Sequence, residues 1–458
     1  MRKNLKAFTL LFISAFFLGQ VTKAAFQVGD STAAQKILAR ANEQHSFEML
    51  RQLTKDIGPR LSGSKNAEKA VLWGLETFKE LGFDSAWIQP VMVPHWERGE
   101  PEQARWLNEN KPFQITALGG SVGTPTEGIT AEVVEVKNFK ELKDLGVEGI
   151  KGKVVFYNRP MDPKLKNTFR AYSLAVDQRS DGAWQAAQYG AQAVLVRSMT
   201  TATDLNPHTG TMNYIDSIQK IPAFAISTED ANALSKGLAK APQKVWLKAN
   251  CQWFPDAESH NVVGELKGKS EKIILVGGHL DSWDLGEGAH DDGAGIVHAI
   301  DALRILKAMN YEPNYTLRAV LFMNEENGAR GGLEYAEQAA LNSEKHVIAI
   351  ESDRGGFQAE AFSVQGNANQ LEKLKRFGSE LVKTGIKEVY AGYGGVDISF
   401  LQEVDSNTVL VGLVPDPEKY FNYHHTAQDI LENVNPKELA SGAAALAYFI
   451  YLCDQRNW

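Results

Sequence analysis

The chain has 458 residues, of which 43% are hydrophobic and 23% charged, so it can form two domains or one large domain with an insertion. The formal net charge of -8 and the lack of a long Lys/Arg run argue against nucleic acid as a partner. The only two cysteines, Cys251 and Cys453, exclude a cysteine-based metal site of the finger type and leave a single disulfide between them open.

The first 24 residues are typical of a secretory signal peptide. A basic segment at residues 1–6 precedes an apolar run at 7–19, and small residues follow, with cleavage expected after Ala24. The apolar run is too short to span a bilayer, so we expect no membrane anchor. A buried N-terminal helix is the alternative interpretation. The sequence therefore predicts a secreted or periplasmic protein.

Residues 25–118 are predicted to form the N-terminal part of a catalytic domain. Apolar spacing favours helices over residues 31–54 and 65–81, with Ser64 as the N-cap of the second helix and Gly82 at its end. A strand is predicted at residues 84–94.

The stretch from residue 119 to residue 249 has a different pattern of predicted elements. Short strands are predicted at 131–136, 153–157, 192–196 and 221–226, with short helices at 183–189 and 230–238. No His/Asp/Glu cluster in this stretch has metal-ligand spacing. We interpret it as an inserted β-rich module that shapes access to a site without supplying the chemistry. The alternative is that it continues the main sheet.

Residues 250–458 alternate between strands and helices. Strands are predicted at 273–276, 316–323, 347–350 and 408–411, and helices at 296–309, 331–340, 370–383 and 436–452. This alternation predicts an α/β fold with a mainly parallel mixed sheet covered by helices on both faces.

Metal-ligand residue types follow each of these four strands. Because the carboxyl ends of parallel strands meet at one edge of a sheet, we expect these side chains to converge. Several carboxylates and imidazoles crowded together need a compensating cation, and a divalent metal is the simplest. Each cluster alone is common in proteins without a metal. The prediction of a metal site rests on the repetition of such clusters at four strand ends. The clusters are His279-Leu280-Asp281 with Asp291-Asp292-Gly293, then Glu325-Glu326, Asp353, and His424-His425-Thr426.

Taken together, these motifs resemble the co-catalytic zinc exopeptidase family, which includes bacterial leucyl aminopeptidases and glutamate carboxypeptidases. The sequence around His279 and His424 is closest to the glutamate carboxypeptidase branch. The resemblance covers nearly all of the mature chain, and it implies a zinc exopeptidase fold with an inserted domain similar to a protease-associated domain. It also suggests a homodimer.

The resemblance implies two zinc ions per chain and a role for each motif residue. Asp291 would bridge the metals, His425 and Glu326 would hold one, and His279 and Asp353 the other. Asp281 would accept the second ring N–H of His279, and Glu325 would be the general base. Spacing alone does not decide between the members of each adjacent pair, namely Asp291 and Asp292, Glu325 and Glu326, and His424 and His425.

Three further residues are candidates for substrate contacts. His424 lies beside a predicted ligand, Asp397 follows a Gly394-Gly395 loop that resembles a pocket-lining loop of the family, and His290 precedes the bridging aspartate. For both histidines, a partly exposed structural role is an equal alternative.

The sequence therefore predicts a secreted zinc exopeptidase that hydrolyses dipeptides or short peptides. Whether it acts at the carboxyl or the amino end stays open. A single-zinc acyltransferase of the glutaminyl cyclase type and a non-catalytic binding protein of the same architecture are further alternatives.

Overall fold

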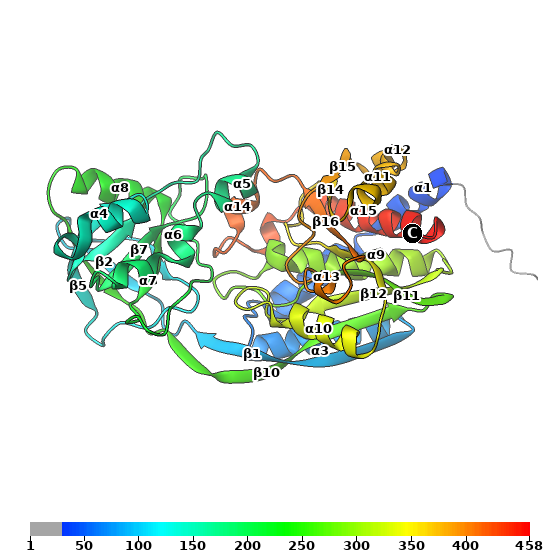
Figure 1. Ribbon diagram of the computed structural model, residues 1–458, viewed down its shortest axis with the longest axis horizontal. Coiled ribbons are helices and arrows are strands. Elements are labelled where there is room, and N and C mark those ends of the chain that lie inside the picture. The colour runs from blue at the N-terminus through cyan, green and yellow to red at the C-terminus, as the bar shows by residue number, and fades with distance from the viewer. Residues whose placement is uncertain (1–29) are drawn as a thin grey trace, which may run out of the picture.

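The computed structural model describes residues 30–458, and the predicted signal peptide lies outside this range. Two eight-stranded sheets organise the described chain, one in each half of the molecule (Figure 1). Among the helices of residues 30–458, none combines the length and apolar character that a bilayer crossing requires.

The main sheet is the predicted mixed sheet. Its strand order is β1-β10-β12-β11-β13-β16-β14-β15. The four central strands β12, β11, β13 and β16 run parallel, and antiparallel pairings flank them on both sides. The strands span β1 Ser85–Glu97, β10 Gln252–Leu266, β11 Ser270–His279, β12 Tyr315–Phe322, β13 His346–Glu351, β14 Ala359–Gln365, β15 Glu388–Ala391 and β16 Val409–Pro415.

Helices cover both faces of this sheet because alternate strand residues point to opposite sides and are apolar on both. On one face, Ile274 and Val276 of β11 belong to the large core with the first group of helices. On the other, Ile273 and Leu275 pack with the second group. The first group is α1 Asp30–Ala41, α2 His45–Arg51, α3 Lys65–Glu80, α9 Ala294–Ala308, α11 Ala368–Lys375, α12 Gly378–Leu381 and α15 Pro436–Gln455; the second is α10 Arg330–Leu341 and α13 Leu401–Val404.

Local sequence accounts for several helix boundaries. The Oγ of Ser64 accepts the backbone N–H of Ala67 at 3.1 Å, which confirms the predicted N-cap of α3. The predicted helix over residues 31–54 is divided at Gln44, whose φ is 62°, and continues as α2 and a π-helical turn at Gln52–Ile57. The predicted helix at 370–383 is likewise divided into α11, α12 and a 3₁₀ turn.

The second sheet is separate from the main sheet, which removes the alternative that residues 119–249 continue it. Its order is β3-β2-β9-β5-β6-β7-β8-β4. Because it includes β2 to β4, it begins at Gln103, earlier than the predicted boundary at residue 119. Its strands are β2 Gln103–Trp106, β3 Lys111–Pro112, β4 Ile115–Ala117, β5 Ile129–Val136, β6 Val154–Tyr157, β7 Ala193–Arg197, β8 Ala223–Ile226 and β9 Lys244–Lys248.

Helices accompany this sheet, so the inserted domain is α/β rather than simply β-rich. They are α4 Phe139–Ile150, α5 Thr168–Ser173, α6 Asp177–Ser180, α7 Gly182–Ala187 and α8 Thr228–Leu238. The chain leaves the main sheet along β1 and returns along β10, and these two long strands pair antiparallel (Figure 1). Cys251 and Cys453 are free and buried in different cores, so they form no disulfide.

Candidate metal centre and active site

The predicted site residues converge at the carboxyl edge of the main sheet. His279 is the last residue of β11, and Glu325 and Glu326 follow β12 by a few residues. Asp353 lies two residues after the end of β13. His425 comes from the loop after β16, just beyond the short helix α14 (Tyr420–Tyr423). Their convergence follows from the parallel order of these four neighbouring strands.

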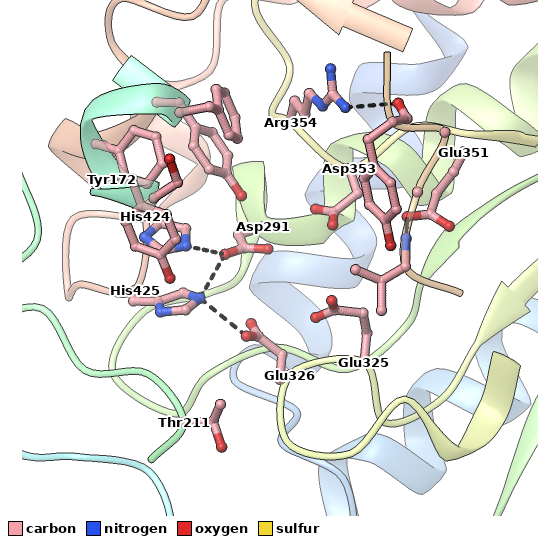
Figure 2. Close-up of a pocket in the computed structure, with 18 of the residues that line it drawn as sticks. Tyr172, Thr211, Asp291, Glu325, Glu326, Glu351, Asp353, Arg354, His424 and His425 are labelled. Carbon is pink, nitrogen blue, oxygen red and sulfur yellow. Dashed lines mark hydrogen bonds and ion pairs between the residues drawn. The ribbon is translucent and has the colours of Figure 1, made fainter. Parts of the chain in front are cut away.

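Asp291 lies between two groups of donor atoms (Figure 2). Its Oδ1 is 3.2 Å from Nε2 of His279, which in turn lies 3.5 Å from Oδ1 of Asp353. Its Oδ2 is 3.1 Å from Nε2 of His425, and the same nitrogen lies 3.1 Å from Oε2 of Glu326. Each carboxylate oxygen of Asp291 therefore lies near a histidine nitrogen that is itself close to a second carboxylate, which is the arrangement expected of a bridging ligand.

The residues present fit divalent metal ions. Oδ2 of Asp291 accepts no hydrogen bond although Nε2 of His425 is close, so the two atoms are aimed at a common point rather than at each other. Burial and then the Asp291 carboxylate raise the pKa of Glu326 to about 7. Burial also raises the pKa of Glu325 and of Asp353. Cations held by imidazole and carboxylate would compensate this buried charge.

In residues 30–458, three overlapping sets of donor atoms lie within 4.8 Å of one another, and all belong to this cluster. The sets are Asp291, His424 and His425; His279, Asp292 and Asp353; and His279, Asp291 and Glu326. Zinc sites that keep open positions for catalysis commonly use this mixture of imidazole and carboxylate ligands.

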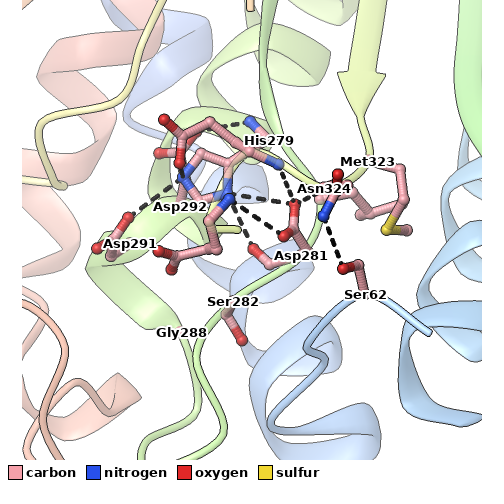
Figure 3. A network of polar contacts seen from close by, with 12 residues as sticks. Ser62, His279, Asp281, Ser282, Gly288, Asp291, Asp292, Met323 and Asn324 are labelled. Carbon is pink, nitrogen blue, oxygen red and sulfur yellow. Dashed lines mark hydrogen bonds and ion pairs between the residues drawn. The ribbon is translucent and has the colours of Figure 1, made fainter. Parts of the chain in front are cut away.

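Hydrogen bonds distinguish Asp291 from its neighbour. Oδ2 of Asp292 accepts the backbone N–H of His279 at 3.0 Å, and Oδ1 accepts that of Gly295 at 2.9 Å (Figure 3). Both oxygens of Asp292 are therefore occupied in joining the end of β11 to the start of α9. The carboxylate of Asp291 remains available to a ligand.

The other adjacent pairs also differ in their surroundings. Glu326 contacts His425, whereas the nearest histidine nitrogen to Glu325 is Nε2 of His279 at 3.9 Å. Nε2 of His424 lies 3.7 Å from Asp291, farther than that of His425. The His424 ring stacks on the His425 ring, with 3.5 Å between centroids.

Asp281 has a different partner from the one predicted. Nδ1 of His279 lies 3.0 Å from the backbone carbonyl oxygen of Asp281, and the Asp281 carboxylate is farther away, at 3.7 Å. That carboxylate instead accepts the backbone N–H groups of Asn324 at 2.8 Å, Glu325 at 3.1 Å and Glu326 at 3.4 Å (Figure 3). Asp281 therefore holds the turn that carries Glu325 and Glu326.

His290 is buried and does not line the cavity described below, which favours the alternative structural role over the predicted substrate contact. The ring is fully buried and packs against the rings of Phe357 and Tyr423, with 4.3 and 5.3 Å between centroids. Its Nδ1 accepts the N–H of Gly356, so Nε2–H faces the carbonyl of Asn433. Burial lowers the pKa of His290 to about 4, consistent with a neutral ring.

Asp397 is also buried and does not line the cavity described below, although its neighbours Gly394, Gly395 and Val396 do. Neither of its carboxylate oxygens has a hydrogen-bond partner. Burial, followed by the neighbouring Glu351 carboxylate, raises its pKa well above the usual range. The prediction that Asp397 contacts substrate is therefore not supported by its position.

A cavity of about 560 Å³ opens onto the cluster and is closed on one side by the inserted domain. Phe169, Tyr172, Arg179 and Thr211 come from that domain, and His424 faces them from the catalytic domain. Sequence reasoning missed these residues of the inserted domain, because nothing in their local pattern places them beside strand ends of another sheet. It also missed Arg354, whose position next to Asp353 was the one available indication.

The inserted domain also touches a predicted ligand directly. The backbone N–H of Thr209 donates to the carbonyl of His425 at 3.0 Å, and Nδ1 of His425 lies 3.3 Å from the carbonyl oxygen of Thr209. With Nδ1–H directed to a carbonyl, Nε2 is free to face Asp291 and Glu326. Asp429, another residue without a predicted role, accepts the backbone N–H of Asp291 at 3.1 Å.

Comparisons with known proteins agree with this geometry. Residues 261–450 match Peptidase family M28. Carboxypeptidase Q of Bos taurus is 37% identical over 413 residues, which cover 90% of this chain and 85% of that protein. Aminopeptidase YwaD of Bacillus subtilis is 24% identical and covers 98% of this chain and 94% of that protein.

Solved structures share the fold. A peptidase M28 precursor from Shewanella amazonensis has a TM-score of 0.87 and 32% identity, covering 92% of this chain and 97% of that chain. A zinc aminopeptidase from Bacillus subtilis has a TM-score of 0.64 at 22% identity, covering 89% of this chain and 94% of that chain, a likeness of fold alone. The chain is a metallopeptidase and belongs to Peptidase family M28.

Proposed function

We propose that the protein is an exported, two-zinc exopeptidase that hydrolyses dipeptides and short peptides at their carboxyl end. The observation that carries this proposal is the cavity of about 560 Å³ over the donor cluster, closed by the inserted domain. A cavity of that size accommodates a ligand of two or three residues and not a folded chain. The similarity to carboxypeptidase Q over 90% of the chain favours action at the carboxyl end.

The metal ligands of the proposal are those suggested by the geometry. Asp291 would be shared by two metal sites, one completed by His425 and Glu326 and the other by His279 and Asp353. When bound, two divalent ions lower the pKa of the attacking water and polarise the scissile carbonyl. The domain organisation is a signal peptide at 1–24, an inserted domain over 103–248, and a catalytic domain formed by the remaining residues. The homodimer stays a prediction.

Glu325 is the general base of the proposal. It lines the cavity and its side chain is partly exposed, unlike the buried Glu326 beside it. Burial and the neighbouring Asp353 carboxylate favour its protonated form. A carboxylate whose pKa is raised in this way can take a proton from water and then deliver it to the leaving amine.

His424 is positioned to orient the substrate. Burial lowers its pKa well below the usual range, so the ring is neutral. Its Nδ1 has no hydrogen-bond partner in the protein, and the ring lies at the cavity wall. A neutral imidazole there can donate one hydrogen bond to the carbonyl oxygen of the scissile peptide.

The test is Glu325→Gln compared with Glu326→Gln. The first variant keeps every proposed metal ligand, so it should retain two zinc ions while kcat on a dipeptide falls about 10²–10⁴-fold. The second removes a ligand and should lose one zinc ion as well as activity. Metal content by atomic spectroscopy separates the two effects. Undiminished hydrolysis by Glu325→Gln would remove it as the base.

Two measurements decide between this function and its alternatives. Hydrolysis of N-blocked dipeptides excludes strict aminopeptidase action, and loss of hydrolysis on C-amidation supports carboxyl-end action. A metal count of one per chain, with cyclisation of peptides that begin with Gln, would instead favour the glutaminyl cyclase type. A protein that binds both metals but cleaves no peptide would be a non-catalytic homologue.

A further inference from the structure

Trp283 is a residue of the catalytic domain whose side chain lies in the core of the inserted domain. It comes four residues after the end of β11, and its indole is 3% exposed within the apolar cluster that covers one face of the second sheet. A Cβ placed on Gly119 would be 1.7 Å from Cη2 of Trp283, so the ring lies directly against this glycine of the inserted domain. The side chain of Trp283 therefore joins the two domains at the edge of the main sheet.

Trp283 also borders one group of proposed metal ligands. Its backbone N–H donates to Oε1 of Glu326 at 3.2 Å, while Oε2 of Glu326 faces Nε2 of His425 at 3.1 Å. The indole ring lies 5.8 Å from the ring of His425, with an interplanar angle of 63°. A small cavity of about 10 Å³ is lined by Trp283 together with Asp291, Glu326 and His425. Both Glu326 and His425 are thus in contact with the residue that enters the inserted domain.

The residue after Trp283 strengthens this connection between the domains. The carboxylate of Asp284 accepts two hydrogen bonds from Arg98, at 2.6 and 2.8 Å. Arg98 also donates to the carbonyl of Ala117 at 2.6 Å and to Oγ1 of Thr209 at 3.3 Å, both in the inserted domain. The backbone of Thr209 in turn donates to the carbonyl of His425. The group formed by Glu326 and His425 is therefore held to the inserted domain through two separate segments.

The other group of proposed ligands, His279 and Asp353, is positioned by the main sheet. His279 is the last residue of β11, and Asp353 follows the end of β13. Within residues 30–458, the polar partners of the His279 ring and backbone N–H all belong to the catalytic domain, namely Asp281, Asp291, Asp292, Glu325 and Asp353. The two groups of ligands therefore differ in what supports them.

We propose that Trp283 is a positioning residue through which the inserted domain fixes the metal site formed by Glu326 and His425. The inference rests on the proposed two-zinc function and gives the inserted domain a part in metal binding. Residues that orient a ligand without touching the metal raise affinity because they hold the ligand atom in the required geometry. Without the indole in the second core, the segment at residue 283 is free to shift, and Glu326 loses the donor that fixes its Oε1.

The test measures the zinc affinity of full-length Trp283→Leu by competition with a chelator of known affinity. The dissociation constant of one zinc ion should rise about 10–100-fold, and that of the other should change less than about threefold. Trp106→Leu is the matched control. Trp106 is 5% exposed in the same core, and its Nε1 donates to Gln243 instead of its backbone contacting a proposed ligand. The control should unfold more easily and keep both dissociation constants.

Double variants identify the zinc ion that is affected. Glu326→Gln disrupts the site that Trp283 is proposed to support, so adding Trp283→Leu should leave the affinity for the remaining zinc unchanged. Asp353→Asn disrupts the other site, so adding Trp283→Leu should weaken the remaining zinc about 10–100-fold. The reverse pattern would overturn the assignment of Trp283 to the Glu326–His425 site.

The possible results separate this inference from the proposed function. A wild-type protein that binds fewer than two zinc ions overturns both. If the wild type binds two and Trp283→Leu holds both as tightly, only the role of Trp283 is overturned. Equal weakening of both zinc ions, or the same weakening in Trp106→Leu, also overturns it, since either indicates a general loss of structure. If Trp283→Leu does not fold, Asp284→Asn decides, because it weakens the link to Arg98 in the same segment; unchanged zinc binding in that variant counts against the inference.

Discussion

Replacing Asp281 by Asn tests how the turn that carries the proposed base is held. The carboxylate of Asp281 is fully buried, and its Oδ1 accepts the N–H groups of Asn324 and Glu325 while Oδ2 accepts that of Glu326. An asparagine has the same size. Its amide oxygen can keep the first two hydrogen bonds, but its NH₂ group then faces the N–H of Glu326, donor against donor.

The magnitude follows from these three hydrogen bonds. Hydrogen bonds to a charged group contribute about 1.5–3 kcal/mol each and neutral ones about 0.5–1.5 kcal/mol. Weakening two bonds and losing the third should therefore lower the free energy of unfolding by about 3 kcal/mol. Because the turn positions Glu325 and Glu326, we also expect kcat/KM to fall about 10–100-fold, as is usual when a residue supporting a metal site is changed.

The assay combines denaturant unfolding with kcat/KM on a dipeptide at a temperature where the variant is fully folded. Asp301→Asn is the matched control, because Asp301 is equally buried but pairs with Arg304 on α9 instead of contacting the cluster. The control should lose stability and keep kcat/KM within about twofold. Wild-type kcat/KM in folded Asp281→Asn would refute the inference that this carboxylate positions the turn.

Two further predictions concern other parts of the structure. Gly210→Ala should lower kcat/KM at least tenfold and lower the free energy of unfolding by about 1–3 kcal/mol. The reason is that φ of Gly210 is +129° and the new Cβ would clash with Arg179 and His425. Wild-type kinetics in this variant would contradict the close packing. Burial lowers the pKa of His346 to about 3 from 6.5, so the unfolded chain binds the extra proton between these pH values and the protein loses stability as the pH falls through this window. His346→Gln can still accept a hydrogen bond from Tyr335. Between about pH 7.5 and pH 5, the free energy of unfolding of this variant, measured with denaturant, should therefore fall by about 2 kcal/mol less than that of the wild type. An equal fall in both proteins would be evidence against this linkage.

The sequence alone was enough to predict the main sheet and the donor residues at its edge. Periodic apolar runs define strands and helices locally, and His279, Asp291, Glu325, Glu326 and Asp353 each lie at or shortly after a strand end. The parallel order of the strands then makes their convergence a consequence of topology. The N-cap of α3 is equally local, since Ser64 and Ala67 are three residues apart.

The tertiary structure decided which atoms face one another. Asp281 contacts a turn 43 residues away rather than the side chain of His279, and the sequence offers no measure of which buried carboxylate meets which N–H group. Thr209 and Arg179 reach His425 and the cavity only because the β1–β10 pair returns the inserted domain to the edge of the main sheet. Chemical identity is encoded locally, whereas hydrogen-bond partners and cavity walls depend on contacts between distant segments. The cluster of donor residues was therefore predictable from the sequence, and the cavity wall contributed by the inserted domain was not.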